Sequence, residues 1–192
     1  LIQATMAVED ARFYDHRGVD VRAVCRAAGQ NLRARRVVSG ASTLTMQTVK
    51  QIHNHPRRPR YKVIEAFRAL QAERAYSKQE ILTWYLNIVP YGGNLIGVEA
   101  AALRYFHKRA ADVTLEEAAL LAGLPQSPSR LRPDRHPDRA RRRRNFVLWR
   151  MYRCDMISYR QYERAAASPV LVTDRMPPMD APHLAQDVHV SG

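Results

Sequence analysis

Two adjacent carboxylates and a histidine lie close together near the start of the sequence. Glu9 and Asp10 follow a short, mostly apolar segment, and Phe13, His16 and Gly18 complete the stretch. A carboxylate near the end of a buried helix is costly unless a partner or a reaction uses it. In a partly desolvated pocket its pKa rises, and it can then act as a general base. A solvated face, or ion pairs with nearby arginines, would explain the two carboxylates without any catalytic role.

Small and hydroxyl-bearing residues form a second cluster between Gly40 and Thr45. In such a turn, backbone N–H groups and hydroxyls such as those of Ser42 and Thr43 can approach a phosphate, and the N-terminus of the following helix favours an anion. Gln47 and Lys50 lie one turn apart in that helix, so both could face one ligand. An ordinary helix N-cap at Ser42 or Thr43 is the alternative interpretation.

A third cluster combines cations with one carboxylate. Arg57 and Lys62 precede Glu65, and Lys62 and Glu65 are neighbours if this segment is helical. Arg grips two phosphate oxygens at once, whereas Lys supplies a point charge. A surface ion pair of small value is the plain alternative for Lys62 and Glu65. Asn87 closes a later motif that starts as a capping box at Ser77.

Helices must position these residues, because few segments alternate with the period of a strand. Ala, Leu, Arg and Glu dominate, which predicts a mainly α domain. Capping boxes predict helix starts at Ser77, Thr114 and Ser158. Asp20 is a typical N-cap for a helix with one apolar side. That side comprises Val21, Val24, Cys25, Ala28 and Leu32.

The charge balance indicates an anionic partner. Among 192 residues, Lys and Arg number 31 and Asp and Glu number 18, which gives a formal charge of +13. Nucleic acid, a membrane surface or a phosphorylated substrate would each fit. We expect no nucleic acid, because the sequence lacks a basic strand with interleaved aromatics and a zinc-ligand pattern. Most arginines of 139–144 are predicted to form a solvated face or to lie near anionic lipid, and part of this run, with the arginines of 33–36, is predicted to favour anionic membranes.

The two cysteines and the chain ends give further expectations. Cys25 and Cys154 lie too far apart to indicate a disulfide framework or a metal site, so each is predicted to be a small core residue.

No stretch is long and apolar enough to span a bilayer, and no signal peptide is visible. The sequence opens inside a helical pattern, which is typical of an excised domain. We predict a domain over residues 1–167 and a linker over residues 168–192.

The order of these motifs resembles glycosyltransferase family 51, the peptidoglycan glycosyltransferase domain of class A penicillin-binding proteins. The matching motifs are E-D-x-x-F-x-x-H-x-G from Glu9, G-x-S-T-x-T-x-Q from Gly40, K-x-x-E from Lys62 and S-K-x-E-I-L-x-x-Y-L-N from Ser77. Residues 91–101 and 143–148 also match. Met46, residues 90–94 and residues 181–183 are most similar to the penicillin-binding protein 1C type.

The resemblance implies a lysozyme-like, mainly α fold with a larger helical lobe and a smaller membrane-facing lobe. It also implies that the chain works at the outer face of the bacterial cytoplasmic membrane, on the periplasmic side. The full-length protein would then contain an upstream membrane anchor and a fused downstream transpeptidase domain, both outside this sequence.

The resemblance further implies a reaction. Such domains polymerise lipid II into β-1,4-linked glycan strands, with inversion at the sugar carbon and release of undecaprenyl diphosphate. Glu9 matches the general base. Glu65 matches a second catalytic carboxylate, which organises cations or a divalent metal (Mg²⁺ or Mn²⁺) at the diphosphate. The residues implied to bind lipid II or the growing strand are Asp10, Phe13, His16, Ser42, Thr43, Gln47, Lys50, Arg57, Lys62 and Asn87.

Two other functions remain open at this point. A lysozyme-like hydrolase that cleaves peptidoglycan would share a helical fold and a catalytic Glu, although the cations around Glu65 favour a diphosphate substrate. A basic, non-enzymatic module would explain the charge but not the ordered motifs. Ala41 stands where the family has a second glycine, and Tyr61 stands where most members have arginine. Neither departure removes a carboxylate.

Overall fold

The computed structural model describes residues 1–36, 40–53, 59–170 and 172. The described residues are mostly helical, and their one sheet pairs β1 (Pro90–Gly92) with β2 (Leu95–Ile96) in antiparallel fashion. Within these ranges, no helix combines the length and the apolar character needed to cross a bilayer. The prediction of a mainly α domain is confirmed.

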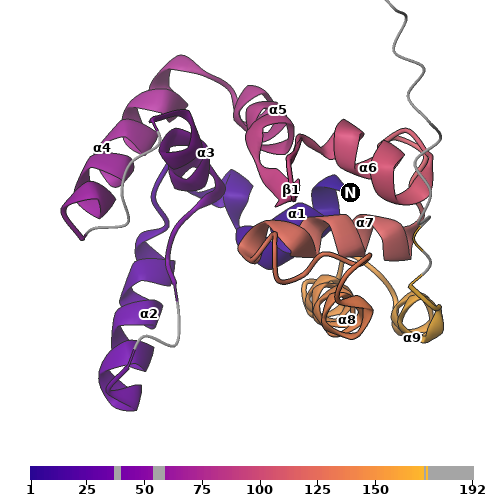
Figure 1. Cartoon of the computed structure of the whole chain (residues 1–192). Helices are drawn as coiled ribbons and strands as arrows, with labels where there is room; N and C mark the ends of the chain where they lie inside the picture. Colours follow the sequence, from indigo (N-terminus) through magenta and orange to yellow (C-terminus); the bar gives the residue numbers. More distant parts are fainter. Residues whose placement is uncertain (37–39, 54–58, 171, 173–192) are drawn as a thin grey trace, which may run out of the picture.

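The helices form two lobes, which Figure 1 shows side by side. The smaller lobe comprises α2 (Val21–Ala34), α3 (Leu44–His53) and α4 (Pro59–Ala75). The larger lobe comprises α1 (Ile2–Glu9), α5 (Lys78–Ile88), α6 (Val98–Phe106), α7 (Leu115–Gly123), α8 (Pro137–Arg153) and α9 (Tyr159–Ala167). Short 3₁₀ helices, Phe13–Asp15 and Leu124–Gln126, follow α1 and α7. The chain therefore passes from one lobe to the other directly after Glu9.

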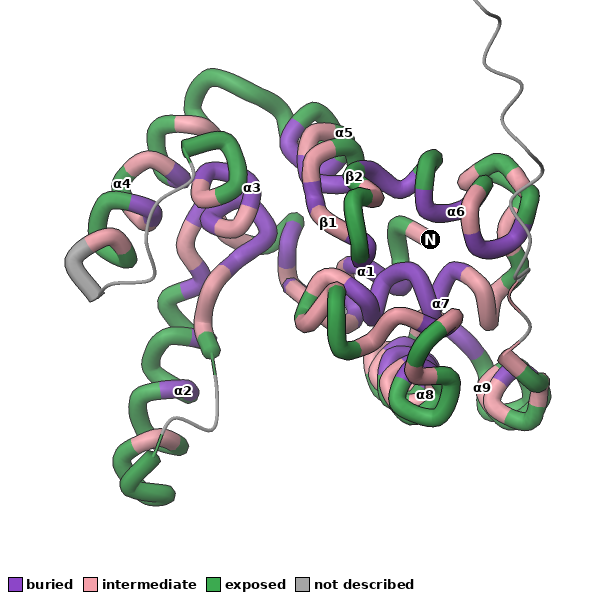
Figure 2. Tube along the Cα trace, viewed as in Figure 1, coloured by how far each residue is buried: buried purple, intermediate pink, exposed green. Residues whose placement is uncertain are grey.

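Helix α7 is the centre of the larger lobe, and Figure 2 shows most of it as buried. Alanines at 119 and 122 pack with Ala4 and Ala7 of α1 against Val147 and Leu148 of α8. Small side chains let helix backbones approach closely, and each of these alanines is at most 2% exposed. The close packing fixes α1, and with it the position of Glu9.

The predicted helix starts are confirmed. Ser77, Thr114 and Ser158 each accept a hydrogen bond from the backbone three residues on, and the side chain at that position accepts one in return. Asp20 caps α2 by accepting from the Ala23 backbone N–H at 2.9 Å. Such caps satisfy backbone donors that helix ends would otherwise leave unpaired.

The predicted apolar side of α2 is not buried. Helix α2 buries Ala23 and Ala27 instead, whereas Val21 is 67% and Leu32 is 82% exposed. Cys25 is exposed and Cys154 is half-buried, so the prediction that both are core residues is wrong. The reason is the position of α2, which projects past α3 and α4 as an arm (Figure 1). Only the part of its alanine face near the lobe finds a partner.

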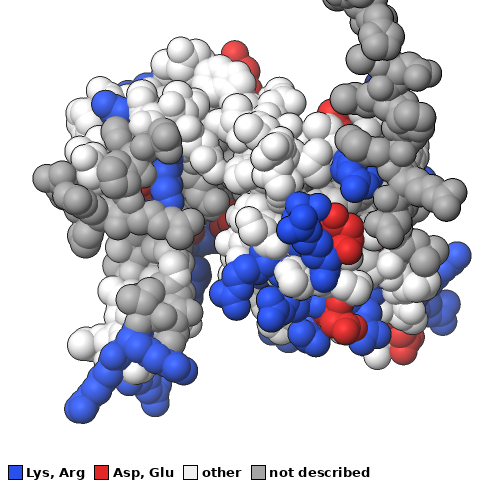
Figure 3. All heavy atoms as spheres, viewed as in Figure 1, with Lys and Arg blue, Asp and Glu red and all other residues white. Residues whose placement is uncertain are grey.

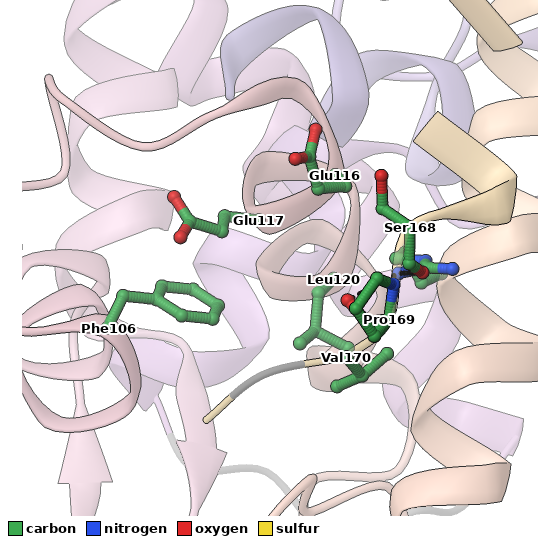
Figure 4. Close-up of a pocket in the computed structure, with 8 residues that line it drawn as sticks. Phe106, Glu116, Glu117, Leu120, Ser168, Pro169 and Val170 are labelled. Atoms are coloured by element: carbon green, nitrogen blue, oxygen red, sulfur yellow. Dashed lines mark hydrogen bonds between the residues drawn. The ribbon is translucent and has the colours of Figure 1, made fainter. Parts of the chain in front are cut away.

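Arg139, Arg141 and Arg142 are exposed, in line with the prediction that most arginines at 139–144 are solvated, but Arg144 is not. Arg144 is 1% exposed, and its guanidinium donates to the carbonyl oxygens of Ala166 (3.0 Å) and Ser168 (2.7 Å) at the end of α9. Arg144 also lines a cavity of about 210 Å³. Figure 4 shows Pro169 and Val170 beside Leu120 of α7 at this cavity. The first residues of the predicted linker therefore pack onto the domain.

Replacing Arg144 should destabilise the fold. In Arg144→Met the carbonyls of Ala166 and Ser168 lose a buried charged donor, so the free energy of unfolding should fall by about 2–4 kcal/mol. Urea denaturation measures this change. The control Arg141→Met alters a side chain that is 59% exposed and should stay within about 0.5 kcal/mol of the parent. Equal midpoints for both variants would show that Arg144 does not hold the end of α9.

Candidate active site

Glu9 lies at the C-terminal end of α1, beside a cavity of about 580 Å³ between the lobes. Residues of both lobes line this cavity. They are Val8, Glu9, Asp10, Ala11, Arg12, Asp20, Ala23, Arg26, Gln30, Gly40, Ala41, Ser42, Thr43 and Arg150. Residues of the first and second sequence clusters therefore line the same cavity.

The surroundings of Glu9 favour a base. Burial raises the pKa of Glu9 and the charge of Asp10 adds to the rise, while a hydrogen bond from Gln47 Nε2 at 2.8 Å and the charge of Arg143 oppose it. The net result is a pKa above that of a free glutamate. Since a carboxylate with a raised pKa holds a proton more strongly, Glu9 is suited to general base catalysis.

Two buried tyrosines complete this environment. Burial raises the pKa of Tyr85 and of Tyr91, and the negative charge of Glu9 raises each further. Both side chains are 1% exposed, and the Tyr85 hydroxyl has no hydrogen-bond partner among the described residues. Tyr85 is therefore a neutral, buried neighbour that feels the charge of Glu9.

Arg143 is a site residue that our sequence analysis missed. Its charge acts on Glu9, its Nε donates to the Gly123 carbonyl at 3.2 Å, and its guanidinium lies 5.2 Å from the Phe146 ring centroid. A signal for it existed in the sequence. Arg143 precedes the buried Val147 by four residues, so helical periodicity turns it toward the core.

Asp10 and His16 hold the smaller lobe in place. His16 Nε2 lies 3.0 and 3.1 Å from the two Asp10 carboxylate oxygens, and one of these oxygens also accepts from the Leu44 backbone N–H at 3.1 Å. Leu44 is the first residue of α3. The end of α1 therefore caps α3, and Gln47, one turn further on, is directed at Glu9.

Thr43 and Gly18 strengthen this junction. The Thr43 hydroxyl donates to the Gly18 carbonyl at 2.6 Å and accepts from the Met46 backbone N–H at 3.1 Å, so it is the N-cap of α3. Gly18 has a φ of +80°, and a Cβ there would lie 2.6 Å from the Ala69 carbonyl oxygen of α4. Only glycine fits this approach.

Lys62 and Glu65 form an ion pair on α4. Lys62 Nζ donates to Glu65 Oε2 at 2.6 Å and to the Ser42 hydroxyl at 2.9 Å. The Glu65 side chain is 2% exposed, whereas the Lys62 side chain is 51% exposed. Ser42 lines the cavity beside Glu9, so the Lys62 ammonium is hydrogen-bonded to a residue of the cavity wall, although Lys62 itself does not line the cavity. An ammonium group has three donors, so one remains for a ligand.

The other predicted ligands occupy different positions. Phe13 is 1% exposed with Lys78 Nζ 4.4 Å from its ring centroid, which makes it a packing residue. Asn87 is exposed on α5, and its side-chain amide donates to the Thr83 carbonyl at 2.9 Å. Lys50 is half-buried on α3, one turn beyond Gln47. Arg57 lies outside the described residues.

Comparison with known proteins identifies the family. The family model described as Transglycosylase matches residues 1–152, which include Glu9, Glu65 and Arg143. The chain belongs to the transglycosylase family. This membership confirms the resemblance to glycosyltransferase family 51 that the motif order indicated.

Relatives of this transglycosylase domain are penicillin-binding proteins. Penicillin-binding protein 1C of Escherichia coli is 45% identical over 94% of this chain and 24% of its own length. Penicillin-binding protein 1A of Aquifex aeolicus is 43% identical over 90% of this chain and 24% of its own. A solved structure of penicillin-binding protein 1A from Haemophilus influenzae covers 68% of this chain and 16% of its own, at 32% identity and a TM-score of 0.49.

The chain spans about a quarter of the length of the curated relatives it matches. One of them is a 1C protein, the type to which the motifs are most similar.

The hydrogen bond from Gln47 should set the pH at which the domain works. As a general base Glu9 would have to be deprotonated, so we expect activity to fall as the pH drops through its raised pKa. In Gln47→Leu a stabiliser of the carboxylate is lost, and the acid limb of the rate profile should move to higher pH. The control Gln79→Leu, exposed on α5, should leave the limb in place. A limb that moves to lower pH, or not at all, would contradict this role of Gln47.

Proposed function

We propose that this transglycosylase domain is a peptidoglycan glycosyltransferase that joins lipid II units into β-1,4-linked strands. One observation carries the proposal most directly. Glu9, a carboxylate with a raised pKa, and Ser42 line the same cavity. Ser42 accepts a hydrogen bond from the ammonium group of Lys62. Glycosyl transfer from a diphosphate needs those two groups, a base for the attacking hydroxyl and positive charge for the leaving group.

In the proposed reaction Glu9 takes the proton from the 4-hydroxyl of the GlcNAc of one lipid II. The hydroxyl oxygen attacks C1 of the MurNAc at the reducing end of the growing strand. The C1–O bond to the diphosphate breaks, and its electron pair leaves with undecaprenyl diphosphate. Attack from the face opposite the leaving group inverts C1, so an α linkage becomes a β linkage.

Cations from the smaller lobe would balance the charge of the departing diphosphate. Lys62 can donate its remaining N–H to a phosphate oxygen while Glu65 and Ser42 hold its ammonium in place. Lys50 and Arg57 are assigned the same role from the family motif alone. Diphosphate is already a good leaving group, so this site needs no acid to protonate it.

A resident divalent metal does not fit the described residues. Glu65 Oε2 already accepts from Lys62, whose ammonium would repel a second cation. In the ranges that the structure describes, no group of three or more His, Cys, Asp or Glu side chains could hold an ion. A metal predicted at Glu65 would depend on oxygens of the diphosphate itself. We therefore assign no step to it.

Hydrolysis of peptidoglycan is the less favoured alternative, because membership of the transglycosylase family favours transfer. The two activities differ in what they consume. Incubated with lipid II, a glycosyltransferase should make polymer that grows with time, and it should leave isolated glycan strands uncut. Shortening of isolated strands, with lipid II untouched, would replace the proposed function by the hydrolase.

A membrane-facing role for the smaller lobe follows from its exposed side chains. Large apolar residues are exposed on all three of its helices, although a soluble lobe of this size would normally cover them. They are Val21, Val24, Leu32, Ile52, Val63, Ile64, Phe67 and Leu70. Exposed arginines at 33, 35 and 36 end the α2 arm and appear as the lower basic patch in Figure 3. We assign this lobe to the outer face of the bacterial cytoplasmic membrane.

Binding to lipid should test this assignment. The domain should bind anionic liposomes, and binding should weaken steeply between low and high salt because exposed charges are screened. Val63→Ser with Phe67→Ser should weaken binding at every salt concentration, by about tenfold since each loses its apolar contact with lipid. The control Ile96→Ser with Leu103→Ser changes exposed apolar residues of the larger lobe and should have little effect. Equal losses for both pairs would remove the assignment.

The length of the relatives bears on the partners of this domain. Because the chain covers only about a quarter of each, we propose that it works beside a fused transpeptidase domain and an upstream membrane anchor. The names of these relatives state that they bind penicillin, which is consistent with a transpeptidase elsewhere in them. A downstream domain would connect to the segment after α9, where Arg144 donates a hydrogen bond to the Ser168 carbonyl.

A further inference from the structure

A second cavity, of about 600 Å³, lies on the larger lobe where α8 begins. Four arginines line it, at positions 130, 139, 142 and 143, together with Gln126, Ser127, Leu131 and Phe146. Figure 3 shows basic side chains gathered on this part of the larger lobe, on the side that faces the smaller lobe. Nothing in the proposed reaction uses this cavity.

The charge of the cavity is not balanced by nearby carboxylates. Arg139 and Arg142 are exposed on α8, and neither forms an ion pair with a described residue. Asp138, the acidic residue next to them, interacts with Arg141 at 3.8 Å instead. Arginines three and four residues apart lie on the same helix face, so Arg139, Arg142 and Arg143 present their guanidinium groups together. The cavity therefore favours an anion.

Arg143 connects this cavity to the catalytic carboxylate. Its guanidinium is fixed by the Gly123 carbonyl and by the Phe146 ring, it lines the cavity, and its charge acts on Glu9. A substrate whose sugar hydroxyl reaches Glu9 would thus place its adjoining groups near the arginines. A membrane is a poorer occupant, because Phe146 is the one exposed large apolar residue among the described residues that line this cavity, whereas eight such residues are exposed on the helices of the smaller lobe.

We propose that Arg130, Arg139 and Arg142 form a subsite for the carboxylates of the short acidic peptide that the MurNAc of lipid II carries. This inference rests on the proposed function. The spread of the guanidinium groups around 600 Å³ suits several separate carboxylates better than one compact diphosphate. Phe146, which is 44% exposed, offers an apolar surface to the peptide between its charges.

The test compares substrates with and without the peptide. In Arg139→Gln with Arg142→Gln, KM for lipid II should rise about threefold to tenfold with kcat nearly unchanged, because exposed charge contacts contribute modestly to binding. With lipid II whose peptide has been removed, the double variant and the parent should be alike. The control Arg141→Gln with Arg160→Gln removes the same charge from exposed positions that do not line the cavity, and it should match the parent on both substrates.

Binding of a soluble disaccharide-pentapeptide, measured by titration calorimetry, keeps this test independent of turnover. The parent should bind it, and the Arg139/Arg142 variant should bind it about threefold to tenfold more weakly. Parent and variant should bind the peptide-free disaccharide with equal affinity. A loss of affinity that persists with peptide-free lipid II would assign the arginines to the diphosphate. Equal binding of the disaccharide-pentapeptide by parent and variant would overturn the peptide subsite, even if lipid II is polymerised. Absence of polymerisation by the parent, with peptide binding intact, would instead overturn only the proposed function.

Discussion

Glu9→Gln should abolish nearly all polymerisation of lipid II in a protein that still folds and binds its substrate. The amide keeps the size of the carboxylate and can accept a hydrogen bond through its oxygen, but it cannot take the proton of the attacking hydroxyl. A general base contributes about a hundredfold to ten-thousandfold to a rate. The variant also loses a buried charge whose pKa is raised by burial, so its stability should equal or exceed that of the parent.

Glu163→Gln is the matched control, because it makes the same chemical change at an exposed position of α9. Initial rates with labelled lipid II, thermal unfolding and lipid II binding should be measured for both variants. Near-normal polymer from Glu9→Gln would show that another group accepts the proton. If Glu9→Gln does not fold, Glu9→Asp is the second variant to measure. Aspartate keeps a carboxylate base but holds it farther from the substrate, so its rate should lie between those of the parent and Glu9→Gln.

Lys62→Met should lower the rate by about a hundredfold to a thousandfold, in the range found when a donor to a developing negative charge is removed. Methionine keeps the length of the side chain but offers no charge to the diphosphate. The buried carboxylate of Glu65 then loses its ion-pair partner, so some loss of stability is expected as well. Measuring rates on protein confirmed as folded by circular dichroism separates the two effects.

Glu65→Gln tests the other half of the pair. It leaves the cation present but less firmly held, so we expect a smaller loss than for Lys62→Met, about tenfold to a hundredfold. Lys108→Met is the control, because Lys108 pairs with Glu117 at 2.8 Å and lies away from the cavity beside Glu9. If Lys62→Met and Lys108→Met polymerised lipid II equally well, the diphosphate would have to be held elsewhere.

Local features of this fold could be predicted from the sequence because their causes are local. The capping boxes at Ser77, Thr114 and Ser158 and the N-cap at Asp20 each depend on residues within one turn. The buried side of α2 could not be predicted in this way. Periodicity shows which side of a helix is apolar, but not whether another element covers that side.

The arginines of α8 illustrate a different limit. A run of charged residues is usually solvated, and this expectation holds for Arg139, Arg141 and Arg142. Arg144, however, occupies a position between Ala140 and Leu148 in the helical repeat, and the carbonyls at the end of α9 satisfy its charge. Those carbonyls belong to residues 22 and 24 positions after Arg144, so no local sequence pattern reveals them.

The candidate site was predictable as a set of motifs but not as a geometry. Glu9, Ser42 and Gln47 were identified from residue types and order. The junction that brings them together depends on contacts across 34 and 38 residues, from Leu44 to Asp10 and from Gln47 to Glu9. At this junction Asp10, His16 and Thr43 form hydrogen bonds within the protein. Residue types alone do not distinguish this supporting role from substrate binding.

The fate of the diphosphate tests the central claim most directly. The domain is incubated with lipid II labelled in the sugar, and both undecaprenyl diphosphate release and product size are followed over time. Transfer predicts one undecaprenyl diphosphate released for each disaccharide added to a growing strand, with both signals nearly absent in Glu9→Gln. Release of free disaccharide in place of polymer would show that water is the acceptor, and would contradict the assignment of this domain as a glycosyltransferase.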